Sequence, residues 1–479
     1  MNSTPPSDAF TPPSHAGWSR LALPDAPSAR WGHSLTQLGE NLLVVGGELT
    51  DLSPSARSDQ IWSLQLGSGW RRLAAGSKTP PARRQHAAAR YGGGDVAVTG
   101  GLGLNGATHG DVWSVRPSSA GYTATLHLEH VALARYGHAL VAMDGGLLLF
   151  GGRVAHRLFD DVVAATGGGG GGELDRARAV VEGGDAGLAL NDLWLLVPEQ
   201  RLVRRLGAAA LDVACEDGAV PCARSDHALL RYGGASAGAA SGCGPLGCVV
   251  VHGGRSNLGA ALADVWLWRP RGASLRALAD GDAGRWARLR PAMGSATPPP
   301  CVSCACALAG DDLFAFGAAG GAPPATLGHA LTPLGRTAAL YRLELRTLRW
   351  AELRMPARAA APEPAGGAAM VVADGGGSLL VVGGSAGGRR DVVETWRFAL
   401  GAACAACEAG EVCDAPTGAC VCASEHCGRG APPYVSPPLV DPEAWGLLVK
   451  ATALIALSAF GSYTGSALTE AARRVVQYR

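Results

Sequence analysis

Residues 42–47 read Leu-Leu-Val-Val-Gly-Gly, a run of aliphatic side chains that ends in two glycines. Near copies of this stretch recur further along the 479-residue chain, at residues 96–101, 147–152, 248–254, 313–318 and 379–384. A short β-branched run bounded by glycine is typical of a buried strand. Because internal repetition decides the fold before any local pattern does, we expect six similar β units that each bury their faces against the next.

Each unit carries further elements in a fixed order around this stretch. An Arg-x-x-His element precedes it in four units, with its histidines at His33, His86, His138 and His227. A polar or acidic residue, an aliphatic residue and a tryptophan follow it, as in Asp111-Val112-Trp113. A later aromatic residue marks a further strand, at Trp70, Trp286 and Trp350. This order predicts a four-stranded, twisted sheet for each unit.

Two residue types carry the architecture of the repeat. Adjacent glycines permit a positive φ where a side chain would clash. Tryptophan supplies a large apolar surface that packs between neighbouring sheets, and its truncation to alanine costs about 3–5 kcal/mol. We therefore predict structural roles for the residues of these types that recur in register: Gly46, Gly47, Gly100, Gly101, Gly151, Gly152, Gly253, Gly254, Gly383, Gly384, Trp62, Trp113, Trp194, Trp266 and Trp396.

The spacing of the repeat is also informative. The double glycines that begin at Gly46, Gly100 and Gly151 are 54 and 51 residues apart, close to the kelch period of about 50 residues. In its Arg-x-x-His elements, glycine pairs and tryptophans, the chain therefore resembles the kelch β-propeller family. The resemblance covers about residues 17–399 and implies an all-β, six-bladed propeller that serves as a binding platform. The expected blades are residues 30–75, 83–130, 135–207, 224–290, 300–353, and 364–398 together with 17–23.

The fifth and sixth units depart from the pattern. In the fifth, Cys301-Val302-Ser303-Cys304 stands where Arg-x-x-His is expected. In the sixth, residues 364–367 replace that element, and no fourth strand follows Trp396. The N-terminal segment 18–21 resembles a fourth strand without a blade. We expect it to pair with the sixth blade and close the ring, because closure removes open sheet edges.

The composition limits the class of partner. Glycine and proline, with 69 and 30 residues, make up more than a fifth of the chain, as many short strands joined by tight turns require. The formal net charge is +1, so no overall field favours nucleic acid or an anionic surface. We therefore expect no nucleic-acid partner.

Thirteen cysteines are many for a cytosolic protein. Close spacing makes ten of them disulfide candidates: Cys215, Cys222, Cys243, Cys248, Cys404, Cys407, Cys413, Cys420, Cys422 and Cys427. Residues 404–427 resemble an EGF-like or laminin-type module, and the pairing of their six cysteines stays open. Zinc at Cys404-x-x-Cys407 is the alternative, although a second knuckle is missing. An odd total leaves at least one free thiol, which we expect among Cys301, Cys304 and Cys306.

The two ends of the chain differ from the repeats. We expect residues 1–16 to be disordered, 428–444 to form a proline-rich linker and 470–479 a short basic tail. Residues 451–469 carry no charge, so we expect a transmembrane helix at 445–469, with an amphipathic or buried helix as the alternative. Residues 1–18 lack the apolar segment of a secretory signal. A propeller outside the cell therefore requires a longer N-terminus than the one present.

The sequence predicts no catalytic, cofactor-binding or metal-binding residues. The four histidines occupy the same place in successive repeats, which favours a structural role, and no nucleophile elbow, phosphate-binding loop or zinc-protease motif occurs. Some kelch-fold proteins are enzymes, with galactose oxidase as the copper-dependent example. The site of that enzyme resembles two histidines, a tyrosine and a Cys-linked tyrosine that converge on the axis. In this sequence we find no such set of residues outside the repeated motif positions. We therefore expect a non-enzymatic protein.

Recognition usually lies on loops held by a rigid scaffold. The connections between second and third strands are long in blades one, three and five, so we expect one face of the ring to bind a ligand and the insertion at 233–247 to lie on the other. The main hypothesis is a membrane-anchored cell-surface protein that binds a protein or glycan, with a domain order that resembles attractin-type proteins. The alternatives are a soluble cytosolic kelch adaptor and, more remotely, a galactose-oxidase-like metal oxidoreductase.

Overall fold

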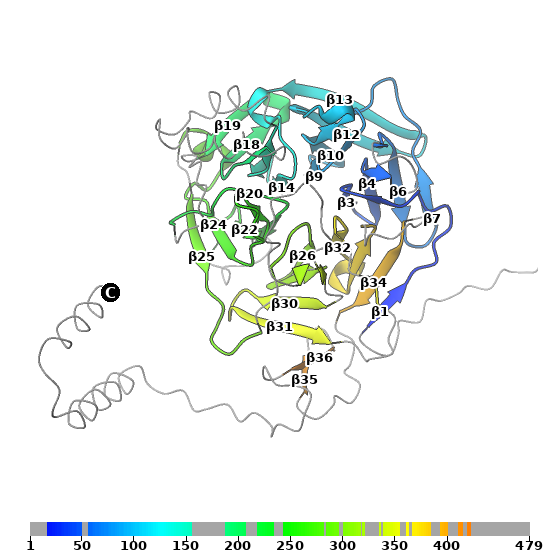
Figure 1. Ribbon diagram of the computed structural model, residues 1–479. Coiled ribbons are helices and arrows are strands. Elements are labelled where there is room, and N and C mark those ends of the chain that lie inside the picture. The colour runs from blue at the N-terminus through cyan, green and yellow to red at the C-terminus, as the bar shows by residue number, and fades with distance from the viewer. Residues whose placement is uncertain are drawn as a thin grey trace, which may run out of the picture. The chain divides into compact units, whose positions relative to one another are not determined.

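Six β-sheets surround a common axis in the computed structural model (Figure 1). The chain divides into two units, Met1–Ala431 and Pro432–Arg479, and every residue described below belongs to the first. The structure describes residues 17–49, 56–155, 187–206, 218–233, 243–281, 284–296, 300–317, 319–320, 335–336, 339–354, 361–363, 366–384, 393–400, 411–414 and 419–422. The six-bladed, all-β architecture expected from the repeats is confirmed.

The predicted N-terminal disorder, proline-rich linker, transmembrane helix and basic tail lie outside the described residues. Within the described ranges, no helix is both long enough and apolar enough to cross a membrane.

Blades one to four are antiparallel sheets whose strands follow one another in sequence order. Blade one contains β3 (Ser34–Leu38), β4 (Asn41–Val45), β6 (Ile61–Gln65) and β7 (Gly69–Arg72). Blade two contains β9 (Ala87–Tyr91), β10 (Asp95–Thr99), β12 (Asp111–Ser118) and β13 (Gly121–Glu129). Blade three contains β14 (Ala139–Met143), β15 (Gly146–Phe150), β18 (Leu193–Val197) and β19 (Leu202–Leu206). Blade four contains β21 (Ala228–Tyr232), β22 (Cys248–His252), β24 (Val265–Arg269) and β25 (Arg285–Leu289).

Blades five and six draw strands from distant parts of the chain. Blade five contains β26 (Ala305–Ala309), β27 (Asp312–Phe316), β30 (Leu340–Glu344) and β31 (Arg349–Arg354), followed by β36 (Ala419–Cys422) and β35 (Glu411–Asp414). Blade six contains β32 (Ala369–Ala373), β33 (Ser378–Val382), β34 (Thr395–Ala399) and β1 (Trp18–Arg20). The ring therefore joins both ends of the repeat region.

The glycine-terminated runs form the second strand of each blade and are buried on both faces. In β15, every residue from Leu147 to Phe150 is fully buried. Leu147 and Leu149 pack with blade two, whereas Leu148 and Phe150 pack with blade four. A strand that is covered on both faces is apolar throughout and does not alternate with polar residues. This is why the runs identify the strands in the sequence.

Strand β1 closes the ring as expected. It pairs antiparallel with β34, so that Trp18 lies opposite Phe398 and Arg20 opposite Trp396. The Trp18 side chain is 6% exposed, and its ring centroid lies 5.1 Å from that of Phe316 and 5.3 Å from that of Phe398. One N-terminal tryptophan thus packs against blades five and six together.

Two described strands of the cysteine-rich segment, β36 and β35, continue the sheet of blade five. In the register of the sheet, Val421 lies opposite Leu353 and Val412 opposite Val421. The same row runs inward through Leu340 and Phe316 to the first strand. The apolar pattern of blade five therefore extends over six strands (Figure 1).

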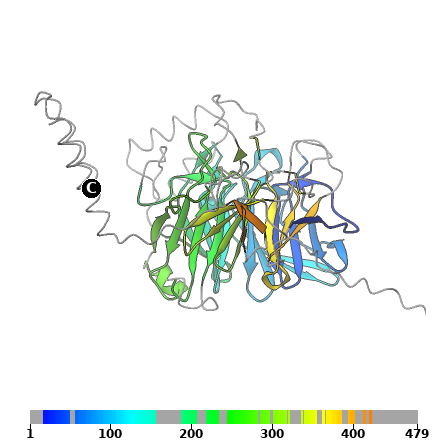
Figure 2. The same ribbon diagram turned by 90° about the horizontal axis from the view of Figure 1, so that it is seen from below.

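Small two-stranded ribbons mark one face of the ring. They are β2 (Arg30–Trp31) with β5 (Glu48–Leu49), β8 (Arg83–Arg84) with β11 (Leu102–Gly103), β16 (Arg153–Val154) with β17 (Leu188–Ala189), β20 (Arg224–Ser225) with β23 (Arg255–Ser256), and β28 (Ala319–Gly320) with β29 (Gly335–Arg336). We call this the ribbon face. The opposite face carries the turns between first and second strands, and we call it the turn face. Figure 2 shows the ring from the side, with the ribbon face at the top.

The described helices are short and peripheral. The single-turn 3-10 helices are η1 (Leu104–Gly106), η2 (Val131–Leu133), η4 (Pro198–Gln200) and η6 (Asp374–Gly376). The α-helix α3 (Leu275–Ala279) joins β24 to β25, and the Ser274 side chain caps its first turn by accepting from the Ala277 N–H.

Candidate interaction site

Blades two, three and four each contain a buried ion pair that links residues of the repeat motif. In blade three, Arg135 Nη1 and Nη2 donate to Asp192 Oδ1 and Oδ2 over 2.6 and 2.9 Å. Neither side chain is exposed to solvent. The corresponding pairs are Arg83 with Asp111 and Arg224 with Asp264. Two parallel hydrogen bonds between charged groups fix both the distance and the orientation of the strands that carry them.

The same carboxylate binds the tryptophan of the repeat. Trp194 Nε1 donates to Asp192 Oδ2 over 2.7 Å, and Arg135 Nη1 also donates to the Gly151 carbonyl over 2.9 Å. Trp113 and Trp266 make the corresponding bonds in blades two and four. Arginine, glycine, aspartate and tryptophan of the repeat therefore form one clamp in each of these blades.

The clamp holds its aspartate in the charged state. Burial by itself raises the pKa of Asp111, but hydrogen bonds from Arg83 and Trp113 bring that pKa below its usual value. The pKa of Asp264 is lowered in the same way against the effect of burial. A buried charge is tolerated here because it is paired and fully hydrogen-bonded.

Blades one and six carry variants of the clamp. In blade one, Arg30 and Trp62 both donate to the neutral Gln60 Oε1, over 3.1 and 3.0 Å. In blade six, Trp396 donates to Glu394 Oε2 over 3.0 Å. Arg20 of β1 lies 3.4 Å from the other oxygen of Glu394. The closing strand therefore brings the guanidinium of Arg20 to a blade whose motif lacks the clamp arginine.

The repeat histidines lie between blades and are structural. His33, His86, His138 and His227 are buried, and the ring of each lies against the first glycine of the preceding blade. A Cβ atom on Gly100 would stand 2.4 Å from His138 Cε1. Gly100 also has a φ of 65°. Space and conformation therefore both require glycine at this position.

Burial keeps these histidines neutral. Burial and then the neighbouring Arg30 lower the pKa of His33 to about 4. Burial and then Arg224 lower the pKa of His227 to about 3. In the described part of the chain, no three His, Cys, Asp or Glu side chains gather as a metal site requires.

The second glycine of each pair links its blade to the next one. Its N–H donates to the carbonyl of the residue that opens the next motif, over 2.7–3.2 Å. The described bonds of this type run from Gly47 to Arg83, Gly101 to Arg135, Gly152 to Arg224, Gly254 to Cys301 and Gly384 to Arg30. The predicted glycine pairs thus act both within a blade and between blades.

A closed ring of backbone hydrogen bonds surrounds the axis, with one residue from each blade. Each N–H donates to the carbonyl of the corresponding residue in the preceding blade, over 2.7–3.4 Å. We call this set the axial ring: Gly32, Gln85, Gly137, Asp226, Ser303 and Gly367. All six have a φ between 51° and 68°. Three of them are not glycine, and a left-handed conformation costs such residues on the order of 1–3 kcal/mol each.

The axial ring corrects the alignment of blade six. The sequence pattern aligned residues 364–367 with Arg-x-x-His, which places Gly367 at the histidine. In the structure Gly367 instead takes the position of Gly32, one residue before the histidine. The buried Ala368 therefore corresponds to His33. Because the motif positions of this blade hold neither the arginine nor the histidine, the sequence offered no anchor for the register.

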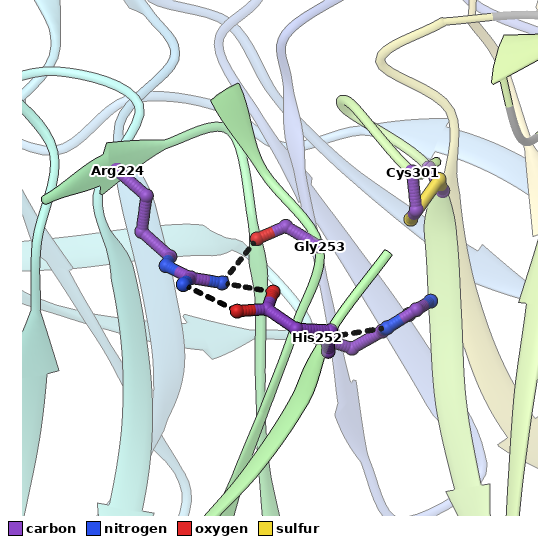
Figure 3. Close-up of a disulfide and its surroundings, with 6 residues drawn as sticks. Arg224, His252, Gly253 and Cys301 are labelled. Carbon is purple, nitrogen blue, oxygen red and sulfur yellow. Dashed lines mark hydrogen bonds and ion pairs between the residues drawn. A yellow bond between two sulfur atoms is a disulfide. The ribbon is translucent and has the colours of Figure 1, made fainter. Parts of the chain in front are cut away.

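A disulfide replaces the clamp in blade five. Cys301 and Cys304, at the arginine and histidine positions, are bonded to each other. Figure 3 shows Cys301 across from the clamp of blade four, with Arg224 and Gly253. Cys306 is a free, partly buried thiol, as expected for at least one of these three cysteines, and desolvation raises its pKa to about 12. The pairing of Cys301 with Cys304 was not predicted.

The other cysteine candidates are placed only in part. Cys243 and Cys248 form a disulfide. Cys222 is also disulfide-bonded, and its predicted partner Cys215 lies outside the described residues. Cys413 and Cys420 are cross-strand neighbours in β35 and β36, and Cys422 ends β36. Cys404, Cys407 and Cys427 lie outside the described ranges.

A continuous chain of polar side chains crosses the ring at the ribbon face. Arg84 Nε lies 2.8 Å from Glu48 Oε2, and Arg84 Nη1 donates to Gln85 Oε1 over 3.1 Å. Gln85 Nε2 then donates to Asp226 Oδ1 over 2.9 Å. The Arg84 guanidinium also lies 4.5 Å from the ring centroid of Trp31. We call these five residues the axial cluster.

The axial cluster is anchored on its far side. Ser225 Oγ donates to Asp226 Oδ2 over 2.9 Å, and Arg153 Nε donates to Ser225 Oγ over 3.0 Å. Arg153 Nη2 continues to the Ser256 carbonyl. Blades one to four thus share one network, which holds aromatic, cationic and amide groups at the mouth of the axis. Such groups suit recognition of a protein surface.

Two exposed leucines lie further out on the ribbon face. Leu104 begins η1, and Leu258 lies in the corresponding connection of blade four. Their side chains are 55% and 64% exposed. The long connections predicted to bind a ligand are described only at their bases, because residues 50–55, 156–186 and 321–334 lie outside the described ranges.

Sequence reasoning missed the axial cluster, although a pattern pointed to it. Four of its five residues stand at the two middle positions of Arg-x-x-His, which read Trp31-Gly32 in blade one, Arg84-Gln85 in blade two and Ser225-Asp226 in blade four. The framing arginine and histidine stay constant because they hold the blades together. Positions that vary inside a constant frame are the ones free to contact a partner.

Residues 11–162 match the family model of the KLHDC2/KLHL20/DRC7 Kelch-repeats domain. This chain contains a kelch-repeat β-propeller domain. The kelch match covers the first two blades and the start of the third.

Curated relatives match this chain over limited lengths. An F-box/kelch-repeat protein of Arabidopsis thaliana is 34% identical over 148 residues, which are 28% of this chain and 30% of that protein. The tRNA wybutosine-synthesizing protein 4 of Homo sapiens is 31% identical over 138 residues, or 28% and 20% of the two chains. Adagio-like protein 1 of Oryza sativa subsp. japonica is 28% identical over 168 residues, or 32% and 26%. The chain therefore spans less than a third of each of these relatives.

The solved structure of YjhT aligns with 78% of this chain and 95% of its own, with a TM-score of 0.51. At 16% identity this likeness concerns the fold alone. The attractin-like domain order finds no support in these comparisons.

Proposed function

We propose that this kelch propeller is a non-enzymatic adaptor that binds a protein partner on its ribbon face. The axial cluster is the observation that carries the proposal, because it joins Trp31, Arg84 and Gln85 in a fixed arrangement at the mouth of the axis. The exposed Leu104 and Leu258 add apolar area further out. Aromatic and arginine anchors with apolar neighbours are the composition of protein-binding hot spots.

The relatives favour the adaptor over the cell-surface hypothesis. One carries an F-box together with kelch repeats in its name, and the kelch family model matches residues 11–162, within blades one to three and the segment before them. The second candidate remains a membrane-anchored recognition protein. It is favoured by the disulfides at Cys243 and Cys248 and at Cys301 and Cys304, since disulfides persist in oxidising compartments.

Thiol counting separates these two candidates. The protein is isolated from its native cells under alkylating conditions, and blocked thiols are counted by mass spectrometry. An adaptor in a reducing compartment should carry these cysteines mostly as thiols, whereas a cell-surface protein should carry them as disulfides and lose its propeller when intact cells are treated with protease.

Paired substitutions test the binding face. The double variant Leu104→Asp and Leu258→Asp should fold normally, because both side chains are exposed. A partner purified with the wild-type protein should bind the double variant at least tenfold more weakly. Met293→Asp is the matched control, since Met293 is 96% exposed and the neighbouring Ala292 N–H donates to the Leu348 carbonyl in the β30–β31 turn, at the end of blade five remote from the ribbons. Equal binding by all three proteins would exclude the ribbon face.

A further inference from the structure

A cavity of about 540 Å³ lies at the seam of blades one and two, on the turn face. Its polar lining comes from both blades: Asn41, Ser63, Arg71, Arg90, Ser118 and Ser119. The rest of the lining consists of turn glycines, a proline and two leucines. The volume is in the range of sites that hold a small ligand or a single side chain of a partner.

The lining carries two positive charges and no negative charge. Arg71 Nη1 donates to the Ser119 carbonyl over 2.8 Å, and Arg71 Nη2 donates to the Ser118 carbonyl over 3.1 Å. These carbonyls hold the guanidinium of blade one against the β12–β13 turn of blade two. They position its charge but do not neutralise it.

Arg231 occupies the position in blade four that Arg90 occupies in blade two, so the surroundings of the two side chains can be compared. Arg90 and Arg231 are both the fourth residue of the first strand of their blades, β9 and β21. Arg231 Nη1 and Nη2 donate to Asp144 Oδ1 and Oδ2 over 2.9 and 2.7 Å. Asp144 lies in the turn between the first two strands of blade three, the preceding blade. In blade four the arginine at this position is therefore neutralised by an aspartate in the turn of the preceding blade.

Arg90 lacks that neutralising partner. Blade one precedes Arg90 as blade three precedes Arg231, and the turn between the first two strands is two residues long in both. Leu38 pairs with Asn41 across the turn of blade one, and Met143 pairs with Gly146 across that of blade three. Gly39 therefore stands where Asp144 stands in blade three. Among the residues that the structure describes, none forms a hydrogen bond or ion pair with the Arg90 side chain.

Nearby carboxylates do not replace it. Arg116 Nε and Nη2 donate to Asp95 Oδ1 and Oδ2 over 2.6 and 3.1 Å, so this carboxylate is already paired. Glu40 is exposed and follows Gly39 in the turn, but it does not line the cavity. The seam therefore keeps two guanidinium groups, hydroxyl groups and an amide facing one cavity without a matching anion.

We propose that this cavity binds a doubly charged oxyanion of the phosphomonoester class. Guanidinium groups match the oxygen spacing of phosphate and donate in pairs. A phosphomonoester carries close to two negative charges and three acceptor oxygens, which matches two arginines and the surrounding hydroxyls. A carboxylate offers only one charge and two oxygens. The site lies on the face opposite the axial cluster and does not depend on the function proposed above.

Calorimetric titration of the full-length protein at low salt tests the proposal. The probes are inorganic phosphate and a capped Ala-phosphoserine-Ala peptide, with the unphosphorylated peptide as the blank. Both phosphate probes should bind with one-to-one stoichiometry, and the blank should not bind. Tighter binding of the peptide identifies a phosphorylated protein side chain as the ligand, whereas equal binding identifies a free phosphate ester.

Three variants make the test specific. Arg90→Gln should weaken phosphate binding at least tenfold, and Glu40→Gln should strengthen it about two- to fivefold by removing a nearby negative charge. Arg231→Gln is the matched control and should leave binding unchanged, because its guanidinium is already paired. All three positions lie at the surface, and circular dichroism verifies the folds. The proposal is overturned if phosphate fails to bind, or if Arg90→Gln and Arg231→Gln have the same effect.

Discussion

The backbone N–H of Gly32 donates to the carbonyl of Gly367 over 3.4 Å, and this bond joins the first blade to the last. It completes the axial ring, in which the other five bonds are 2.7–3.0 Å long. The propeller is therefore closed twice, by the axial ring at the centre and by β1 at the outer edge of blade six. Residues more than 300 positions apart in the chain meet at both closures.

Removing the side chain of Trp18 should open the outer closure. Trp18 is 6% exposed and packs against Phe316 and Phe398. We expect Trp18→Ala to lower the free energy of unfolding by about 3–5 kcal/mol, the cost of truncating a buried aromatic residue. Urea unfolding monitored by circular dichroism measures the change. Ser19→Ala, in the same strand, should cost less than about 1 kcal/mol, and similar losses for both would argue against the closing role of Trp18.

Breaking a clamp should cost far more than breaking a surface ion pair. Asp192→Ala leaves the guanidinium of Arg135 buried without its anion, and we expect a loss of about 3–5 kcal/mol. Asp280→Ala removes the partner of Arg276, in a pair whose side chains are 92% and 74% exposed, and should cost less than about 1 kcal/mol. Chemical denaturation of both variants at pH 7 makes the comparison. A loss below about 1 kcal/mol for Asp192→Ala would contradict the role of the clamp.

The buried histidines should make the protein less stable in mild acid. The unfolded chain takes up protons near pH 6.5, whereas His33 in the folded chain does so only near pH 4. The unfolded state therefore binds more protons between these values, and the free energy of unfolding falls as the pH falls from about 6.5 to 4. A shift of this size corresponds to a loss on the order of 3 kcal/mol for this one histidine.

Denaturation midpoints at pH 7.5, 6, 5 and 4 measure this dependence. His33→Gln should have a shallower profile than the wild-type protein, because it removes one of the protons that unfolding takes up. Asp111 and Asp264 have lowered pKa values and act mainly below their usual pKa of 3.8, outside this window. Parallel profiles for the two proteins would count against a neutral, buried His33.

The disulfide of blade five should stabilise the ring in place of the missing clamp. It closes a very short loop, and the double variant Cys301→Ser and Cys304→Ser should cost about 2 kcal/mol from the loss of this link. Cys306→Ala is the control, because Cys306 lies partly buried in β26, the strand that begins directly after Cys304, but is not cross-linked. Thermal unfolding without reductant compares the two variants. If the control loses as much as the double variant, the covalent link contributes nothing of its own.

The sequence predicted the scaffold well because its residues act in the same way in every blade. Gly100 is required by both its φ and the contact with His138, and Trp194 by its bond to Asp192. Each requirement recurs at the same offset in the other blades, so the repeat reveals it. The order of six blades and the pairing of β1 with β34 follow directly from that regularity.

The sequence could not predict features that depend on single blades or on distant pairing. Gln85 and Asp226 meet across the axis although 141 residues separate them. Strand β36 joins β31 through only two cross-strand pairs, at Leu353 and Arg354. Because β36 lies outside the repeats, no repeated pattern predicts this pairing. The alignment displaced Gly367 by one residue because the motif of blade six lacks the arginine and histidine that set the register in blades one to four. Local patterns carry no information on these relationships.

The axial ring uses only main-chain atoms, and this separates the integrity of the propeller from the chemistry at its mouth. Glutamine, aspartate and serine occupy it beside the three glycines, at Gln85, Asp226 and Ser303, despite the cost of their left-handed conformation. Point substitutions at these sites can therefore change which surface the mouth recognises while the blades stay joined. An inserted or deleted residue would instead shift a blade out of register, so new specificities on this scaffold should arise by side-chain replacement rather than by a change in the length of the inner segments.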